Sequence, residues 1–258
     1  MEQFVQIETL IKQAKTAALS AGNCLRQVYS KNKGVLSSCG KDIKTEADKA
    51  AELLMLKSLR SNGYAILSEE SGLLNTDNDF PTICDSALPI WIIDPLDGTF
   101  NFTRGFPCCC VSIALWRGLN PVLGVIYDFV SEKLYSGVAG KGASCNDLEI
   151  KVSSVGHHDQ AALAMGFPSC RDYSNAALAE SISNVQRFKK IRMIGSAALS
   201  LAYVATGIFD AYLEEDIWLW DVAAGLAMVK AAGGSYVCSD TKDSFKLNVA
   251  ASNGLLAI

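Results

Sequence analysis

The hydrophobic pattern of the first quarter of the chain predicts two helices and one short strand. In residues 3–29, apolar side chains recur close to a helical period, at Phe4, Ile7, Leu10, Ile11, Ala14, Ala18, Leu25 and Val28. A loop with Gly34 and Gly40 follows. A second helix is predicted from about Glu46 to Leu59, since it carries an apolar stripe and Asn62-Gly63 is a stop signal. Residues 64–67 then predict a strand that ends on Ser68-Glu69-Glu70-Ser71.

The middle of the chain is rich in strands. Residues 72–89 predict a polar loop, which leads into the apolar strand Ile90–Ile93. The segments 109–116, 122–127 and 133–139 are also strand-like, and Gly, Asn or Pro turns separate them. Neighbouring strands with short links are typical of an antiparallel sheet.

The pattern changes after about residue 150. Strands are predicted at 162–167, 189–194, 208–213 and 235–238, with helices at about 174–187, 197–205 and 219–231 between them. This alternation indicates a layered α/β arrangement. We therefore expect two halves, residues 1–152 and 153–258, with the boundary near Val152–Gly156.

Composition narrows the class of protein. The chain has 258 residues, of which 50% are hydrophobic and 19% charged, so it can bury a sizeable core. The formal net charge is −4, and no run of Lys or Arg stands out, which disfavours nucleic acid as a partner. No apolar stretch reaches membrane-spanning length, and the N-terminus does not resemble a signal peptide. We expect a cytoplasmic protein with no membrane partner.

Cysteine usage agrees with a reducing compartment. The nine cysteines form no CxxC pair, and the only two histidines are adjacent, at positions 157 and 158. A Cys/His zinc site is therefore disfavoured. We interpret the cysteines as small apolar residues.

The segment from Trp91 to Phe102 carries the most informative chemistry. An apolar strand leads into two acids, Asp94 and Asp97, and then into Gly98-Thr99 and a predicted helix start. Hard cations such as Mg²⁺ take oxygen ligands, and backbone N–H groups at a helix N-terminus attract anions. This combination indicates chemistry on a phosphate ester.

Three more acidic positions share this context, in which an apolar element borders a carboxylate. They are Asp42 with Asp48, Glu69 with Glu70, and Asp221, which precedes an apolar helix. Taken singly, each has an ordinary structural explanation as a first-turn acid, a solvated loop or a turn former. Together at one edge of the sheets, these acids would repel one another and raise each other's pKa unless a bound cation removed that cost.

These motifs, in this order, resemble the signatures of the inositol monophosphatase family, a Mg²⁺-dependent, lithium-sensitive phosphomonoesterase superfamily. The resemblance rests on the Asp-x-x-Thr-x-x-Asp spacing of residues 42–48, Ser-Glu-Glu-Ser (68–71), Trp-Ile-Ile-Asp-Pro-Leu-Asp-Gly-Thr-Phe-Asn-Phe (91–102), Gly-Phe-Pro (105–107), Gly-Lys-Gly-Ala (140–143), Gly-Ser-Ala-Ala (195–198) and Trp-Asp-Val-Ala-Ala-Gly (220–225). It implies a layered αβαβα sandwich of the sugar-phosphatase type, with the site between its two halves. It also implies a homodimer.

The resemblance implies roles for particular residues. One Mg²⁺ would be held by Glu69, Asp94 and the Leu96 carbonyl, and a second by Asp94, Asp97 and Asp221. A third ion would join near Glu69, and Mn²⁺ would substitute for Mg²⁺. The Gly98 and Thr99 N–H groups would cradle the phosphate. The Thr99 hydroxyl, with Asp48 behind it and Glu69 beside it, would orient and deprotonate the attacking water. Glu70 would be a supporting acid.

The leaving-group side is expected in the second half of the chain. Glu214 matches a position that binds sugar or inositol hydroxyls, Ser196 and Ala197 match a pocket-lining loop, and Arg192 faces either the pocket or the partner subunit. Two departures from the family pattern concern this side: Ser37 stands where a lysine is frequent, and Asp216 makes the Glu214-Glu215-Asp216 run more acidic than usual.

Asn101 favours myo-inositol 1-phosphate or a similar sugar monophosphate as substrate, because nucleotide-directed relatives tend to carry an acid there. Two alternatives stay open. One is a 3′-phosphoadenosine 5′-phosphate or fructose 1,6-bisphosphate phosphatase. The other is a catalytically silent regulatory homologue, which the intact acid set disfavours.

Overall fold

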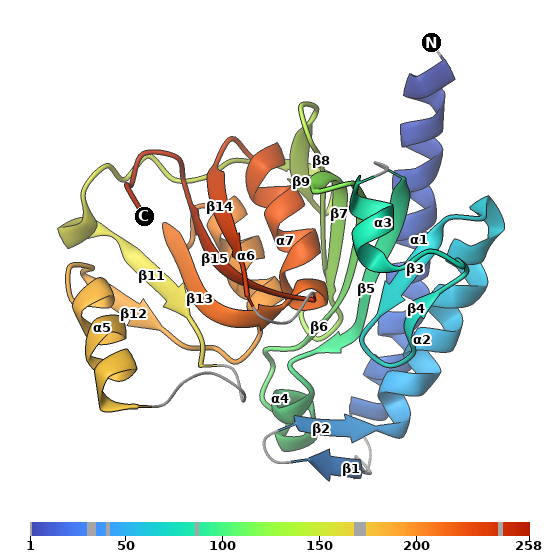
Figure 1. Ribbon diagram of the computed structural model, residues 1–258, viewed down its shortest axis with the longest axis horizontal. Helices are drawn as coiled ribbons and strands as arrows, with labels where there is room; N and C mark the ends of the chain where they lie inside the picture. The colour runs from blue at the N-terminus through green and yellow to red at the C-terminus, as the bar shows by residue number, and fades with distance from the viewer. Residues whose placement is uncertain (1, 30–34, 40–41, 86–87, 168–173, 242–244) are drawn as a thin grey trace.

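Two β-sheets alternate with three layers of helices in the computed structural model of the protein (Figure 1). It describes residues 2–29, 35–39, 42–85, 88–167, 174–241 and 245–258. The order of layers is α1 and α2, the larger sheet, α6 and α7, the smaller sheet, and α5. The predicted αβαβα sandwich is confirmed, and both sheets are mixed.

The first half of the chain forms one helical layer and the larger sheet. Its elements are α1 (Glu2–Tyr29), β1 (Val35–Cys39), β2 (Asp42–Thr45), α2 (Glu46–Leu59), β3 (Ala65–Ser68), β4 (Gly72–Leu74), α3 (Phe80–Asp85), β5 (Pro89–Asp97), α4 (Thr99–Arg104), β6 (Cys110–Arg117), β7 (Asn120–Asp128), β8 (Lys133–Val138), β9 (Gly142–Cys145) and β10 (Leu148–Ile150). Within the described residues the larger sheet has the order β10-β9-β8-β7-β6-β5-β3-β4.

The second half supplies the middle helices and the smaller sheet. Its elements are β11 (Ala162–Met165), α5 (Asn175–Val185), β12 (Lys190–Arg192), α6 (Ala197–Ala205), β13 (Ala211–Trp218), α7 (Leu219–Ala231), β14 (Ser235–Asp240) and β15 (Lys246–Ser252). The smaller sheet has the order β12-β11-β13-β15-β14 over the part of the chain that is described. The first three of these strands run parallel to one another.

The main hydrophobic core lies around α6 and α7. Both helices are buried over most of their length, since both of their faces are covered by a sheet. A second core fills the space between α1, α2 and the other face of the larger sheet. A third, smaller core lies where α5 meets the smaller sheet. Residues from both predicted halves share the main core, so the halves pack as adjoining layers.

Several sequence predictions need correction. Residues 72–89 are not simply a loop, because they contain β4 and α3, and the glycine-bordered segment near residue 40 contains the hairpin strands β1 and β2. The larger sheet is not wholly antiparallel, since β3 and β5 run parallel after the chain crosses over through α3. The short strands β9 and β10 carry too few apolar residues to be recognised by pattern.

Two strands extend further than their apolar runs indicate. β5 continues from Ile93 through Asp97, and β13 starts later and runs on through Glu214 to Trp218. Each contains an irregularity in pairing, between Asp94 and Asp97 in β5 and between Glu214 and Ile217 in β13. Backbone pairing with neighbouring strands carries these polar segments into the sheets, and the irregularities re-aim their side chains.

None of the described helices is long and apolar enough to cross a membrane. The seven cysteines whose side chains are described are all free thiols.

Gly124 on β7 marks the closest approach between the larger sheet and α7. A Cβ at this position would lie 2.2 Å from the Ala224 carbonyl oxygen. We expect Gly124→Ala to lower the free energy of unfolding by about 1–3 kcal/mol, because the backbone of α7 must move away. Denaturant unfolding measures the change, and Gly156→Ala is the matched control, since no atom lies within 4 Å of a Cβ there. Equal stability of the two variants would contradict this account.

Candidate metal centre

Three aspartates from distant parts of the sequence converge at one point. Asp94 and Asp97 lie in the last part of β5, and Asp221 lies in the first turn of α7. Each offers a carboxylate oxygen, and these oxygens all lie within 4.8 Å of one another. Asp94 and Asp97 are buried and Asp221 is partly exposed. Such a set of hard oxygen donors fits a divalent cation such as Mg²⁺.

The position of Asp221 depends on how α7 is fixed to the larger sheet. The Ser112 hydroxyl on β6 donates to the Trp220 carbonyl at 3.4 Å, and Trp116 Nε1 on the same strand donates to the Ala223 carbonyl at 3.2 Å. Both bonds hold the first turns of α7 above β6, next to β5. Asp221 is thereby carried to the end of β5.

The electrostatics of the centre favour a cation. Burial raises the pKa of Asp94 well above its usual value, and the negative charges of Glu69, Asp97 and Asp221 raise it further. Burial also raises the pKa of Asp97 to about 6, although several hydrogen-bond donors partly offset this rise. A bound cation would stabilise the ionised carboxylates that burial and mutual repulsion destabilise.

Ser196 and Ala197, expected to line a pocket, lie behind Asp97 at the start of α6. The Ser196 hydroxyl donates to Asp97 Oδ2 at 2.5 Å, and the Ala198 N–H donates to the same oxygen at 2.8 Å. Ser196 is also the N-cap of α6, because its hydroxyl accepts the Leu199 N–H. The N-terminus of α6 therefore orients one carboxylate of the centre, a contact that the sequence did not reveal.

The turn after β5 brings Asp48 and Thr99 together. The Thr99 hydroxyl lies 3.2 Å from Asp48 Oδ1 and 2.9 Å from the Leu96 carbonyl oxygen, and can donate to either. The Leu96 N–H donates to Asp94 Oδ1 at 2.9 Å. These bonds fix the turn that holds the Leu96 carbonyl and the Thr99 hydroxyl beside Asp94 and Asp48.

Gly98 makes this turn possible. Its φ of 85° lies in the left-handed region, and a Cβ would lie 2.6 Å from the Cys108 carbonyl oxygen. Gly98 caps α4, so the N–H groups of the first turn of α4 have no acceptor within the helix.

Glu69 lies on the turn that follows β3. Its N–H donates to the Ile93 carbonyl at 3.3 Å, which continues the parallel pairing of β3 with β5. Its side chain hydrogen-bonds with Asp94 and contributes to the raised pKa of that carboxyl. Glu70, next in the turn, is partly buried. The catalytic role of Glu69 and the supporting role of Glu70 stay predictions.

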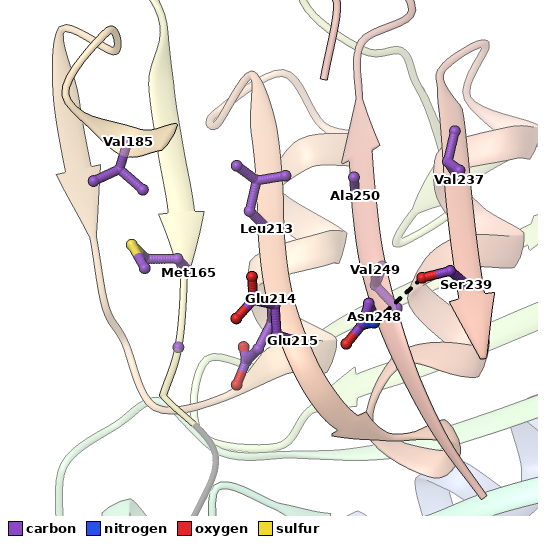
Figure 2. Close-up of a pocket in the computed structure, with 11 residues that line it drawn as sticks. Met165, Val185, Leu213, Glu214, Glu215, Val237, Ser239, Asn248, Val249 and Ala250 are labelled. Atoms are coloured by element: carbon purple, nitrogen blue, oxygen red, sulfur yellow. Dashed lines mark hydrogen bonds between the residues drawn. The ribbon is translucent and has the colours of Figure 1, made fainter. Parts of the chain in front are cut away.

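Glu214 lies apart from the aspartates, at a cavity of about 220 Å³ on the smaller sheet (Figure 2). Glu215 and apolar residues of β11, β13, β14 and β15 also line this cavity, whereas the three aspartates do not. Glu214 Oε2 accepts the Tyr212 hydroxyl at 2.6 Å. Burial, and then the charges of Glu214, Asp221 and Asp97, raise the pKa of Tyr212 well above its usual value. Tyr212 therefore contacts a residue of the cavity and lies close enough to Asp221 and Asp97 for their charges to act on its hydroxyl.

Arg192 and Asn101 have contacts that the sequence did not predict. The Arg192 side chain is exposed on β12 and donates to the Ile191 carbonyl at 2.9 Å. The Asn101 amide lies 2.8 Å from both the Cys108 and Ile194 carbonyl oxygens. Asn101 thus ties α4 to the segment that leads into α6.

The structure explains one of the two departures from the family pattern. Asp216 adopts a left-handed conformation, with φ of 57°, at the irregularity in β13. Its carboxylate lies 3.4 Å from Lys246 Nζ, and its N–H donates to Asn248 Oδ1 at 3.0 Å. Lys246 therefore offsets its negative charge. The other departure, Ser37, lies in β1, and its side chain is outside the described residues.

Fold and site together define a layered α/β protein with a buried carboxylate centre suited to divalent cations. The inositol monophosphatase family model matches residues 6–257. The chain therefore belongs to the inositol monophosphatase family, whose members act on phosphate monoesters and depend on Mg²⁺.

Similar proteins support this assignment along nearly the whole chain. A protein named Nus factor SuhB, from Xylella fastidiosa, is 40% identical over 227 residues, covering 86% of this chain and 78% of that protein. Inositol monophosphatase 3 from Solanum lycopersicum is 36% identical over 264 residues, covering 99% and 96%. The solved structure of the inositol monophosphatase from Anabaena (Nostoc) sp. PCC 7120 has a TM-score of 0.82 at 34% identity, covering 97% and 92%.

The raised pKa of Asp97 predicts how the stability of the metal-free protein depends on pH. Since the folded-state pKa of about 6 exceeds that of an unfolded aspartate, protonation stabilises the fold, and this contribution is lost as pH rises through 6. Between pH 5 and 7 we expect it to change the free energy of unfolding by on the order of 1 kcal/mol.

Chemical denaturation in a chelator measures this pH dependence. It should be weaker in Asp97→Asn and unchanged in the control Asp159→Asn, which alters an exposed acid. An Asp97→Asn curve parallel to that of the unaltered protein would show that Asp97 does not titrate in this range.

Proposed function

We propose that the protein is a Mg²⁺-dependent phosphatase that hydrolyses a small phosphate monoester, myo-inositol 1-phosphate or a related sugar phosphate. The observation that carries this proposal is the convergence of Asp94, Asp97 and Asp221 beside the first turn of α4. Mutually repelling buried carboxylates call for cations, and a helix start next to them suits a phosphate.

The donor set fits two Mg²⁺ ions. Glu69, Asp94 and the Leu96 carbonyl would hold one, and Asp94, Asp97 and Asp221 the other. A third ion would bind near Glu69, and Mn²⁺ is a substitute. Bound divalent ions would lower the pKa of the attacking water and stabilise negative charge on the reacting oxygens. We also propose that Li⁺ competes with Mg²⁺ at the second ion site.

The chain's own residues orient the reaction. Gly98 and Thr99 would offer backbone N–H groups to the phosphate at the start of α4. When the Thr99 hydroxyl donates to Asp48, its oxygen is left to accept a hydrogen bond from the attacking water. With Glu69 beside it, this pair would take the proton. Ser196 and the start of α6 keep Asp97 ionised and in place.

The acids on β13 suggest a leaving group with hydroxyls rather than a second phosphate. Glu214 and Glu215 both line the cavity, whereas the charge of Asp216 is offset by Lys246. Carboxylates accept hydrogen bonds from polyol hydroxyls and repel phosphate. This favours a sugar or inositol monophosphate over 3′-phosphoadenosine 5′-phosphate or fructose 1,6-bisphosphate. We assign Glu214 to the substrate side, together with Ser196, Ala197 and Arg192.

A catalytically silent regulatory homologue is the second candidate, because relatives from three bacteria are named Nus factor SuhB. The chain retains every acid that the proposed ion sites need, namely Glu69, Asp94, Asp97 and Asp221. Retention of these repelling groups supports hydrolysis over a silent role.

We further propose a homodimer. Phe100, Phe106 and Met193 are about half exposed, at 54%, 49% and 55%, and all three lie near the contact of Asn101 with Ile194. Exposed apolar residues gathered in this way are typical of a subunit interface. Light scattering coupled to size-exclusion chromatography tests the assembly state, and a monomer at micromolar concentration would reject it.

Phosphate release from a panel of substrates tests the function directly. With Mg²⁺, we expect hydrolysis of myo-inositol 1-phosphate or a sugar monophosphate to exceed that of the two bisphosphates. Asp94→Asn should reduce kcat by more than about 100-fold, because it removes the ligand shared by both ions. Asp240→Asn, which alters an exposed acid on β14, should retain full activity. An Asp94→Asn variant with full activity would show that the reaction does not need the Asp94 carboxylate.

Asp221→Asn separates the second ion from the first. Because Asp221 is the partly exposed member of the cluster, its loss should raise the Mg²⁺ concentration for half-maximal activity by about tenfold. The far-ultraviolet circular dichroism spectrum should not change. A Mg²⁺ titration that coincides with that of the unaltered enzyme would exclude Asp221 as a ligand.

A further inference from the structure

Glu52 is a buried acid that the assigned site does not include. It lies on α2, its exposure is 5%, and its carboxylate accepts two serine hydroxyls. Ser68 donates to Glu52 Oε1 at 2.5 Å, and Ser71 donates to Glu52 Oε2 at 2.8 Å. The two serines are the first and last residues of the turn that carries Glu69 and Glu70. One carboxylate therefore spans the turn from end to end.

The same helix also contacts the turn that follows β5. Asp48 lies four residues before Glu52, so both side chains are on one face of α2. Asp48 lies 3.2 Å from the Thr99 hydroxyl, beyond the end of β5. α2 also packs against β5, which lies beside β3 (Figure 1). Two buried acids, one helical turn apart, thus brace the turns after β3 and β5.

Two backbone contacts also hold the Ser68–Ser71 turn. The Glu69 N–H donates to the Ile93 carbonyl at 3.3 Å, and Ser68 pairs with Gly72 across β3 and β4. Both ties act on the backbone at one side of the turn. The bonds to Glu52, in contrast, act on side chains at both ends of the turn.

We propose that Glu52 is a positioning residue for the metal centre, which holds the Ser68–Ser71 turn so that Glu69 faces Asp94. This proposal deepens the proposed function and rests on it. Residues that orient metal ligands through hydrogen bonds contribute substantially to metal affinity. Loss of Glu52 therefore weakens the ion that depends on Glu69, while the aspartate cluster keeps its own geometry.

Direct Mn²⁺ binding, followed by the electron paramagnetic resonance signal of free Mn²⁺, tests this without relying on turnover. We expect Glu52→Ala to weaken the Glu69-dependent binding step by about tenfold. Glu52→Gln should fall between Glu52→Ala and the unaltered protein, because its amide keeps one acceptor. Glu52→Gln also keeps the side-chain volume, so it provides the answer if Glu52→Ala does not fold. The matched control is Glu46→Ala, which removes an exposed acid from the same helix.

A double-variant comparison shows whether Glu52 acts through Glu69. In a Glu69→Ala background, Glu52→Ala should change Mn²⁺ binding no further, because the ligand that it positions is already absent. An additional loss in that background would overturn the proposal. So would a lowered melting temperature with unchanged Mn²⁺ affinity, which would make Glu52 a residue of the core only.

The failure of the proposed function gives a different result. If the unaltered protein binds Mn²⁺ but hydrolyses none of the phosphate esters, the phosphatase proposal fails while the comparison of Mn²⁺ affinities still decides the role of Glu52. If the unaltered protein binds no Mn²⁺, no ion site depends on Glu52, and the proposal is overturned as well.

Discussion

The repulsion between buried carboxylates is the constraint on which the rest of the site depends. Asp94 and Asp97 share one strand, Asp221 comes from a helix more than a hundred residues later, and burial raises the pKa of the two strand residues. Charges of one sign gather in a protein interior only when the fold holds them there and something else stabilises them. Hydrogen bonds from α6 supply part of that stabilisation, and the donor set is suited to divalent ions for the remainder.

The layered architecture supplies the force that holds these groups together. α6 and α7 are apolar on nearly all sides because both sheets cover them, and their N-termini lie at the end of β5. Hydrophobic burial on both faces holds the helices in place. The hydrogen bonds from Ser112 and Trp116 fix the position of the first turns of α7 relative to β6. Apolar packing therefore supplies most of the free energy that holds the acids close together. Polar contacts set the final orientation of their carboxylates.

Much of this arrangement could be predicted from sequence, for identifiable reasons. An apolar stripe marks α2, continuous apolar runs mark α6, α7 and the apolar parts of β5 to β8, and the Asp-Pro-Leu-Asp-Gly-Thr motif marks the turn after β5. The polar continuations of β5 and β13 could not be predicted, because pairing with neighbouring strands keeps them extended. The hydrogen bonds from serine hydroxyls to Glu52 and Asp97 could not be predicted either, since the partners are distant in sequence. Only the four-residue spacing between Asp48 and Glu52 hinted that two acids share a helical face.

The cavity beside Glu214 lies on the smaller sheet, whereas the aspartates lie on β5 of the larger sheet and on α7. Under the proposed function, the groups that would act on the ester bond and the cavity that would bind the alcohol therefore belong to separate layers. Substitutions on β11, β13, β14 or β15 can reshape the recognition surface while the ion-holding groups keep their geometry. A scaffold divided in this way lets substrate preference drift between lineages at little cost to the underlying hydrolytic chemistry.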